Sequence, residues 1–267
     1  MNNIIKQEIQ SFFTALMFYT RIPCPKWVDH SQEYLQLSRK YFPFIGWIVG
    51  GISGMVLWGA TYLFSIEISV LISMIVGVLL TGAFHEDGFA DTLDGFGGGW
   101  TKEKILLIMK DSRIGTFGVV GLVLIMLLKF VLIIEITGQY TSKTNWYIII
   151  LLISAHSLSR WSALTFFMTH KYSKENDKIG SKSKPLAVGK FPISNFVITS
   201  IFGIIPILFL RNYYFFLLII PVYIAKWLLG RWFNKWIDGY TGDCLGATQQ
   251  ICEVVFYLGI LGLWKFI

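Results

Sequence analysis

Seven long apolar runs are the feature that most constrains how this chain can fold. They cover about residues 43–64, 68–85, 116–137, 146–169, 193–210, 213–230 and 251–267. A helix needs about 20 mostly apolar residues to cross the hydrocarbon of a bilayer. Of the 267 residues, 54% are apolar and only 15% are charged, too few to cover a water-soluble protein of this size. The pattern predicts an all-α, polytopic membrane bundle of about seven transmembrane helices, built as a single domain over residues 1–267.

A shorter apolar pattern precedes the first run. Ile5, Ile9, Phe12, Phe13 and Leu16 recur at helical spacing within residues 4–19. The segment is interrupted by polar residues and is too short to span a bilayer. We therefore expect an N-terminal amphipathic or half-buried helix.

The basic residues predict the orientation of the bundle. With the N-terminus inside, 17 Lys and Arg residues fall in inside segments and only Lys143, Arg211 and Lys265 fall outside. Basic loops stay on the cytoplasmic side of membrane proteins. The loops 86–115, 170–192 and 231–250 would then share the cytoplasmic face. The net charge of +7 has the same origin, so we expect no nucleic-acid partner.

Three basic residues, Lys129, Arg160 and Lys226, lie inside apolar runs. A charge at the bilayer centre is costly, so such residues usually face the interior of a bundle or a wet cavity. We expect this of Arg160, which follows His156 by one helical turn. Lys226 lies near the end of its run, and we expect its ammonium group to reach the membrane surface.

The segment 81–95 holds the most informative chemistry. Asp87, Asp91 and Asp94 are spaced i, i+4 and i+7, which places them within about 60° of one another on a helix. Three carboxylates on one face repel one another unless a cation compensates, and Mg²⁺ suits oxygen ligands that share it with phosphates. The alternative is a solvated loop in which these residues are caps and turn formers. Glu86 points elsewhere by angle, and His85 could be a ligand, a general base or an interface histidine.

Three later segments add candidates. Thr101 is predicted to cap a short helix over 102–110, and Arg113 beyond it can fork onto phosphate oxygens, although an ordinary basic helix cap would look similar. Asp243 could be a metal ligand or a helix N-cap. The lysine-rich loop 170–192 either anchors the topology or steers an anionic substrate.

These motifs together resemble the cobalamin synthase family, the adenosylcobinamide-GDP ribazoletransferases. The resemblance is carried by four separated blocks in the same order: 13–25, 42–46, 82–94 continuing in 108–118, and 241–247. Between residues 125 and 235 it rests mainly on hydropathy. It implies a transferase at the bacterial cytoplasmic (inner) membrane, in contact with lipid.

The reaction implied by the resemblance is the Mg²⁺-dependent joining of adenosylcobinamide-GDP to α-ribazole or α-ribazole 5′-phosphate, with release of GMP. On that basis we expect Asp87, Asp91, Asp94 and Asp111 to bind the metal, with Asp243 as a further candidate. Phosphate oxygens would be bound by Lys110, Ser112, Arg113 and Arg21. Either Asp94 or His85 would accept the proton of the attacking hydroxyl.

Two other classes of membrane protein share part of this pattern. A CDP-alcohol phosphotransferase also uses an Asp cluster, but its pattern requires Arg at the position of Asp91 and Gly at the position of Trp100. A cation transporter places acidic residues near the bilayer midplane, often on paired repeats, whereas here they gather at one face and no repeat is evident. The sequence leaves open the lower-ligand base, the number of metal ions and the oligomeric state, a homo-oligomer included.

Overall fold

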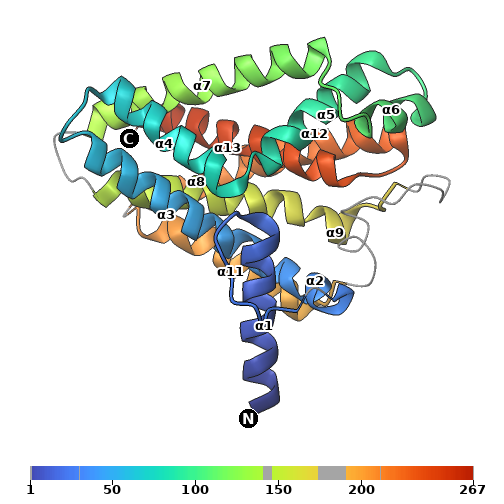
Figure 1. Cartoon of the computed structure of the whole chain (residues 1–267). Helices are drawn as coiled ribbons and strands as arrows, with labels where there is room; N and C mark the ends of the chain where they lie inside the picture. Colours follow the sequence, from blue (N-terminus) through green and yellow to red (C-terminus); the bar gives the residue numbers. More distant parts are fainter. Residues whose placement is uncertain (1, 30, 141–145, 174–190, 211, 267) are drawn as a thin grey trace.

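The computed structural model describes residues 2–29, 31–140, 146–173, 191–210 and 212–266, and within them the chain is a helical bundle (Figure 1). Long helices lie side by side across the bundle. The only β-type pairing among these residues is an isolated bridge between Tyr172 and Tyr240. The helices are α1 (Asn2–Tyr19), α2 (Gln32–Ser38), α3 (Phe42–Ala60), α4 (Ile66–Thr81), α5 (Phe84–Gly98), α6 (Lys102–Met109), α7 (Thr116–Tyr140), α8 (Trp146–Leu164), α9 (Phe166–Thr169), α11 (Ile193–Leu208), α12 (Ile219–Ile237) and α13 (Gly242–Trp264), with 3-10 turns at Arg39–Tyr41 and Tyr213–Leu218.

The seven apolar runs are all helical, but fewer than seven are long enough to cross a bilayer alone. Among the described residues, five helical segments pass by length and composition, or six if the bent pair α4 and α5 forms one span. Helix α11 has 16 residues, about 24 Å at 1.5 Å per residue, against about 30 Å of hydrocarbon. The expectation of an all-α polytopic membrane protein is confirmed, with five or six candidate spans and the shorter apolar helix α11 among the described residues, against the expected number of about seven.

Helix α8 forms the centre of the bundle. In its most apolar stretch 78% of the residues are buried, against 28% for α7. Helix α3 packs closely along it, because Gly46, Gly50 and Gly54 recur every four residues and expose their backbone to α8. A Cβ on Gly50 would lie 2.7 Å from the carbonyl oxygen of Leu152. Small residues at this spacing let membrane helices approach.

The outer helices present apolar side chains that water would not tolerate. In α7, the side chains of Val120, Leu124 and Leu127 are each at least half exposed. On α12, Ile220 and Leu228 are exposed in the same way. A continuous apolar surface of this kind on a helix of spanning length is suited to lipid. The structure therefore supports a multi-pass protein in contact with membrane lipid.

Helix α1 projects from the bundle across the direction of the long helices (Figure 1). Its first half exposes Ile4, Ile5 and Ile9, while its second half buries Ala15 and Leu16 against the rest of the protein. The helix is anchored by Glu8, which accepts hydrogen bonds from Lys40 at 2.7 Å and Tyr41 at 2.6 Å. The expected amphipathic, half-buried helix is thus present.

Candidate active site

A sharp bend between α4 and α5 creates the start of the candidate site. Gly82 and Ala83 both adopt left-handed backbone conformations, with φ of 63° and 57°, and the two helices meet at 86°. Glycine tolerates this region, but a left-handed alanine costs of order 1 kcal/mol. This strained turn changes the direction of the chain between α4 and α5, just before His85, Glu86 and Asp87.

Helix α5 then crosses the beginning of α13 with almost no space between the backbones. A Cβ on Gly88 would lie 3.0 Å from the Cα of Asp243, and one on Gly246 would lie 3.1 Å from the carbonyl oxygen of His85. Thr241 caps α13 by accepting a hydrogen bond from the amide of Cys244 at 3.3 Å. The N-cap interpretation of Asp243 is therefore wrong, and its carboxylate lies in the first turn of the helix.

This crossing brings three predicted metal ligands together. Asp91 lies close enough to Asp243, Asp87 and Asp94 for their charges to interact, and Asp243 interacts likewise with Asp87. Asp87 is exposed, and Asp91 and Asp243 are half-buried. Within the part of the chain that the structure describes, none of these three forms an ion pair with Lys or Arg. Their mutual repulsion is therefore not compensated by an ion pair with any cation of the described segments.

The donor set fits Mg²⁺ better than a metal that needs a protein cage. No three His, Cys, Asp or Glu side chains among the described residues converge closely enough to hold an ion by themselves. Mg²⁺ keeps several water ligands and is usually bound by one or two carboxylates together with substrate phosphates. Two helices whose carboxylates lie close enough to interact electrostatically can supply the one or two protein ligands that this requires.

Asp94 has a different environment from the other acids. Its side chain is buried, and its two oxygens accept hydrogen bonds from the amide of Gly115 at 2.6 Å and of Gly118 at 2.8 Å. These amides belong to the N-terminus of α7, where unpaired backbone donors favour a negative charge. Asp94 therefore fastens α5 to α7 as a capping group.

The loop 110–115 between α6 and α7 carries the predicted phosphate ligands. Thr101 caps α6 as expected, accepting from the amide of Lys104 at 3.3 Å. Arg113 donates to both oxygens of Asp111, with an Nη2–Oδ2 distance of 2.6 Å. These side-chain hydrogen bonds, and one from the Arg113 amide, lower the pKa of Asp111 to about 2. Asp111 is thus paired with Arg113 and is not among the carboxylates that interact most with Asp91.

Arg21 and His85 lie at the α4–α5 bend. The amide of Arg21 donates to the carbonyl of Leu80 at 2.7 Å, and its exposed side chain passes over Gly82. His85 is 2% exposed, and its Nε2 atom has no hydrogen-bond partner among the described residues. Lys110 and Ser112 lie in the 110–115 loop, and most of the lysine-rich segment 170–192 lies outside the described residues.

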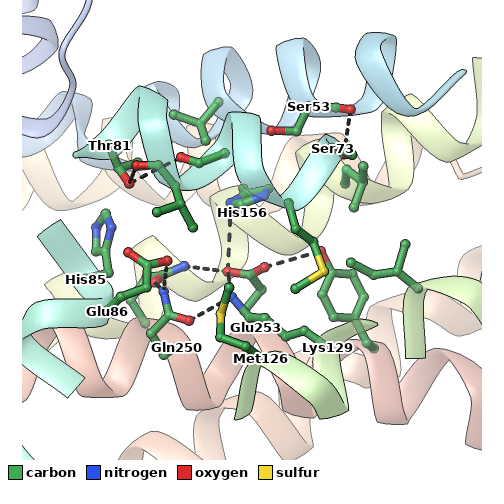
Figure 2. Close-up of a pocket in the computed structure, with 18 of the residues that line it drawn as sticks. Ser53, Ser73, Thr81, His85, Glu86, Met126, Lys129, His156, Gln250 and Glu253 are labelled. Carbon is green, nitrogen blue, oxygen red and sulfur yellow. Dashed lines mark hydrogen bonds and ion pairs between the residues drawn. The ribbon is translucent and has the colours of Figure 1, made fainter. Parts of the chain in front are cut away.

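A polar cavity lies inside the bundle, next to the bend between α4 and α5 (Figure 2). Glu253 of α13 is 3% exposed and pairs with Lys129 of α7 at 3.1 Å, while Tyr257 and Gln249 donate to its oxygens. Gln250 accepts from Lys129 at 2.7 Å and donates to Glu86 at 2.9 Å. The network therefore joins α5, α7 and α13. It lies next to the place where α5 crosses α13 and brings Asp87, Asp91 and Asp243 together, which we call the acidic crossing.

The cavity itself has a volume of about 40 Å³, enough for about three waters. Four atoms of residues that line it are buried and have no partner within the described ranges: Ser53 Oγ, His85 Nε2, Glu86 Oε2 and Arg160 Nε. Buried polar groups of this kind are normally satisfied by ordered water. Arg160 faces the bundle interior as expected, bonded to the carbonyl of His156 at 2.9 Å.

The sequence did not identify this network. The helical angle of Glu86 separates it from the three aspartates, and the same angle directs its carboxylate towards Gln250 of α13. Lys129 and Glu253 are each the rare charge in an apolar helix, and that shared property was the available signal for their pairing. Lys226 does not extend to the membrane surface: it is 2% exposed and donates to Thr169 at 2.6 Å over the ring of Phe166.

Comparison with known proteins identifies the family. A sequence model described as cobalamin-5-phosphate synthase matches residues 11–261. The chain belongs to the cobalamin-5-phosphate synthase family. This confirms the resemblance carried by the four sequence blocks, and with it an enzyme of the transferase class in cobalamin biosynthesis.

Curated relatives of the family match over nearly their whole length. The adenosylcobinamide-GDP ribazoletransferase of Leptospira interrogans is 43% identical over 278 residues, covering 99% of this chain and 100% of the relative. The protein of the same name from Shewanella frigidimarina is 42% identical over 257 residues, covering 96% of each chain. No solved structure matches the chain significantly. These matches favour the family over the CDP-alcohol phosphotransferase and transporter alternatives.

Proposed function

We propose that this chain catalyses the Mg²⁺-dependent transfer named in its relatives, joining adenosylcobinamide-GDP to α-ribazole or α-ribazole 5′-phosphate. A ribose hydroxyl oxygen forms a bond to the phosphorus attached to cobinamide, the P–O–P bond breaks, and GMP leaves. The single observation that carries the proposal is the crossing of α5 and α13, which brings Asp87 and Asp91 to Asp243. Phosphoryl transfer depends mainly on positioning and on neutralising charge, which such a site provides.

Asp87, Asp91 and Asp243 are the residues that would hold Mg²⁺. Bound there, the ion would neutralise charge on the pyrophosphate oxygens and on the departing GMP. Asp94 is left out of this set because both of its oxygens accept backbone amides. We assign acceptance of the hydroxyl proton to Asp91, which is half-buried between Asp87 and Asp243, in place of Asp94 or His85.

The guanidinium of Arg113 would bind the pyrophosphate. In the ligand-free protein, Asp111 orients the Arg113 guanidinium at the surface through hydrogen bonds. A phosphate can accept two hydrogen bonds from the guanidinium in the same bidentate geometry. Lys110 and Ser112 of the same loop, and Arg21 at the α4–α5 bend, would add donors. Asp111 then serves to orient Arg113 and is not required as a metal ligand.

The reaction would take place at the cytoplasmic face of the bacterial inner membrane, with the N-terminus inside. The support is the excess of basic residues in the segments on the side of the acidic crossing. A membrane-impermeant maleimide tests the orientation. We expect Lys104→Cys to be labelled only after the cytoplasmic side is opened, and Lys265→Cys to be labelled in intact cells; the reverse pattern would place the site outside.

Activity is tested with the protein in nanodiscs supplied with adenosylcobinamide-GDP and α-ribazole 5′-phosphate. GMP release and the cobamide product are followed by chromatography, with Mg²⁺ or with a chelator. The kcat of the Asp87→Asn variant is expected to be at least a hundredfold lower than that of the wild type. Asp238→Asn is the matched control, because Asp238 is an exposed residue whose left-handed backbone Asn also tolerates. A folded wild-type protein that forms no product would overturn the proposal.

A further inference from the structure

A second cavity, which we call the aromatic pocket, lies on the other side of His85 from the polar cavity. Most of its wall is ring faces and edges, and it contains few polar atoms. Tyr19 stacks on Phe42 at 4.3 Å between ring centroids, and Phe42 in turn stacks on His85 at 5.7 Å with an angle of 17°. The aromatic side chains that line it with His85 are Phe18, Tyr19, Phe42, Phe84, Phe167, Tyr172 and Tyr240.

The pocket adjoins the acidic crossing through both of its helices. On α5, His85 precedes Asp87 by two residues, and on α13, Gly242 directly precedes Asp243. The far wall is held by the bridge between the segments at Tyr172 and Tyr240, in which the amide of Ser173 donates to the carbonyl of Tyr240 at 2.8 Å. A ligand in the pocket would therefore lie beside the residues proposed to bind metal and phosphate.

The lining of the pocket favours an aromatic ligand. Aromatic rings form most of its wall, and a planar ring that packs against such side chains is stabilised by stacking and edge contacts.

His85 lines the pocket, and among the described residues its buried Nε2 atom has no hydrogen-bond partner. In the tautomer that carries the ring proton on Nε2, a ligand that supplies one acceptor would satisfy this donor. The ring lies in the wall between the aromatic pocket and the polar cavity, since His85 lines both.

We propose that the aromatic pocket binds the planar base of the ribazole substrate, with His85 hydrogen-bonded to the free ring nitrogen of that base. This inference rests on the proposed function. Guanine is the other planar base in the reaction, but its edge carries several donors and acceptors that a mostly apolar pocket would leave unsatisfied. A benzimidazole attached to ribose retains a single ring acceptor, which matches the single unpartnered nitrogen of His85.

Direct binding to the protein in nanodiscs tests the proposal without depending on turnover. The probes are α-ribazole and GDP. Leu245→Trp fills the pocket from α13 and is expected to weaken α-ribazole binding about tenfold or more while leaving GDP binding unchanged. Leu263→Trp is the matched control, since Leu263 is a half-buried leucine at the other end of the same helix.

A second variant keeps the test valid if Leu245→Trp does not fold. Phe84 is 41% exposed at the pocket wall, so Phe84→Ala should leave the fold intact and still weaken α-ribazole binding about tenfold. If GDP binding falls instead, the pocket binds guanine; if neither ligand is affected by either variant, it binds no base. Either result overturns the inference, whereas loss of product formation with α-ribazole binding intact would overturn only the proposed reaction.

The role of His85 is tested by a double-mutant cycle with the ligand. The probe is the riboside of indole, which has carbon in place of the free ring nitrogen. Wild-type protein should bind it about tenfold more weakly than the riboside of benzimidazole. In His85→Phe, which keeps a flat ring, the two ribosides should bind equally. An undiminished preference in His85→Phe would show that His85 does not contact the base.

Discussion

Gly88 of α5 lies directly against the backbone of Asp243 in α13. A Cβ added at Gly88 would be 3.0 Å from the Cα of Asp243 and 3.1 Å from its carbonyl oxygen. The contact fixes how far the carboxylates of the two helices can stand apart. A position on one helix thereby controls the geometry of a site shared by both.

Gly88→Ala is expected to lower kcat about tenfold or more, because α13 must move by a few tenths of an ångström and carry Asp243 with it. GMP release in nanodiscs measures the effect. Gly262→Ala is the control in α13, where no atom lies within 4 Å of the added Cβ. If Gly88→Ala retains full kcat, the spacing of the two helices does not limit catalysis.

Mg²⁺ is expected to raise the melting temperature of the wild-type protein, because an ion bound only by the folded state stabilises it. At a hundred times its Kd the gain is about 2.7 kcal/mol. Asp87→Asn and Asp243→Asn should lose most of this response, and without Mg²⁺ they should be at least as stable as wild type, because charge repulsion is relieved. A wild-type melting temperature indifferent to Mg²⁺ would argue against a metal at the crossing.

Asp94→Ala is expected to destabilise the protein by roughly 1–3 kcal/mol while preserving the response to Mg²⁺. The reason is that the amides of Gly115 and Gly118 lose their acceptors and α7 loses its cap. Thermal unfolding with and without Mg²⁺ separates the two properties. If stability is unchanged and the Mg²⁺ response disappears, Asp94 is a metal ligand.

Arg113→Ala is expected to raise the KM for the pyrophosphate substrate about tenfold, by the same factor at pH 6 and pH 8. Hydrogen bonds from Arg113 lower the pKa of Asp111 from 3.8 to about 2. The stabilisation of this ionised pair is complete above about pH 4 and is lost only as pH falls towards 2. Initial rates at the two pH values test this, with the exposed Lys104→Ala as control. A pH-dependent factor would mean that another titrating group orients Arg113.

Lys129→Met and Glu253→Gln are each expected to cost about 3–5 kcal/mol, because either change leaves one buried charge without its partner. The double variant should be more stable than the sum of the two single losses predicts. Chemical denaturation in mixed micelles measures all four proteins. Additive losses would show that the two charges do not act as a pair.

Local patterns in the sequence were sufficient for much of the fold. The apolar runs predicted helices because a membrane helix must be apolar along its length. Thr101 was recognised as a cap because capping needs only a hydroxyl at the right position in the chain. The boundaries were less accurate: α13 begins at Gly242, nine residues before the expected start, because its first turns pack against α5 and so carry polar residues.

The sequence by itself determined the membrane-embedded helical class, the family, and the acidic face that bears Asp87 and Asp91. Only the tertiary structure decided that Asp243 joins that face, that Asp94 caps α7, and that Lys129 pairs with Glu253. Helical periodicity is a local property that a segment carries in its own residues. Which helices cross, and at which glycine, depends on close packing between segments more than 100 residues apart, and no single segment encodes it.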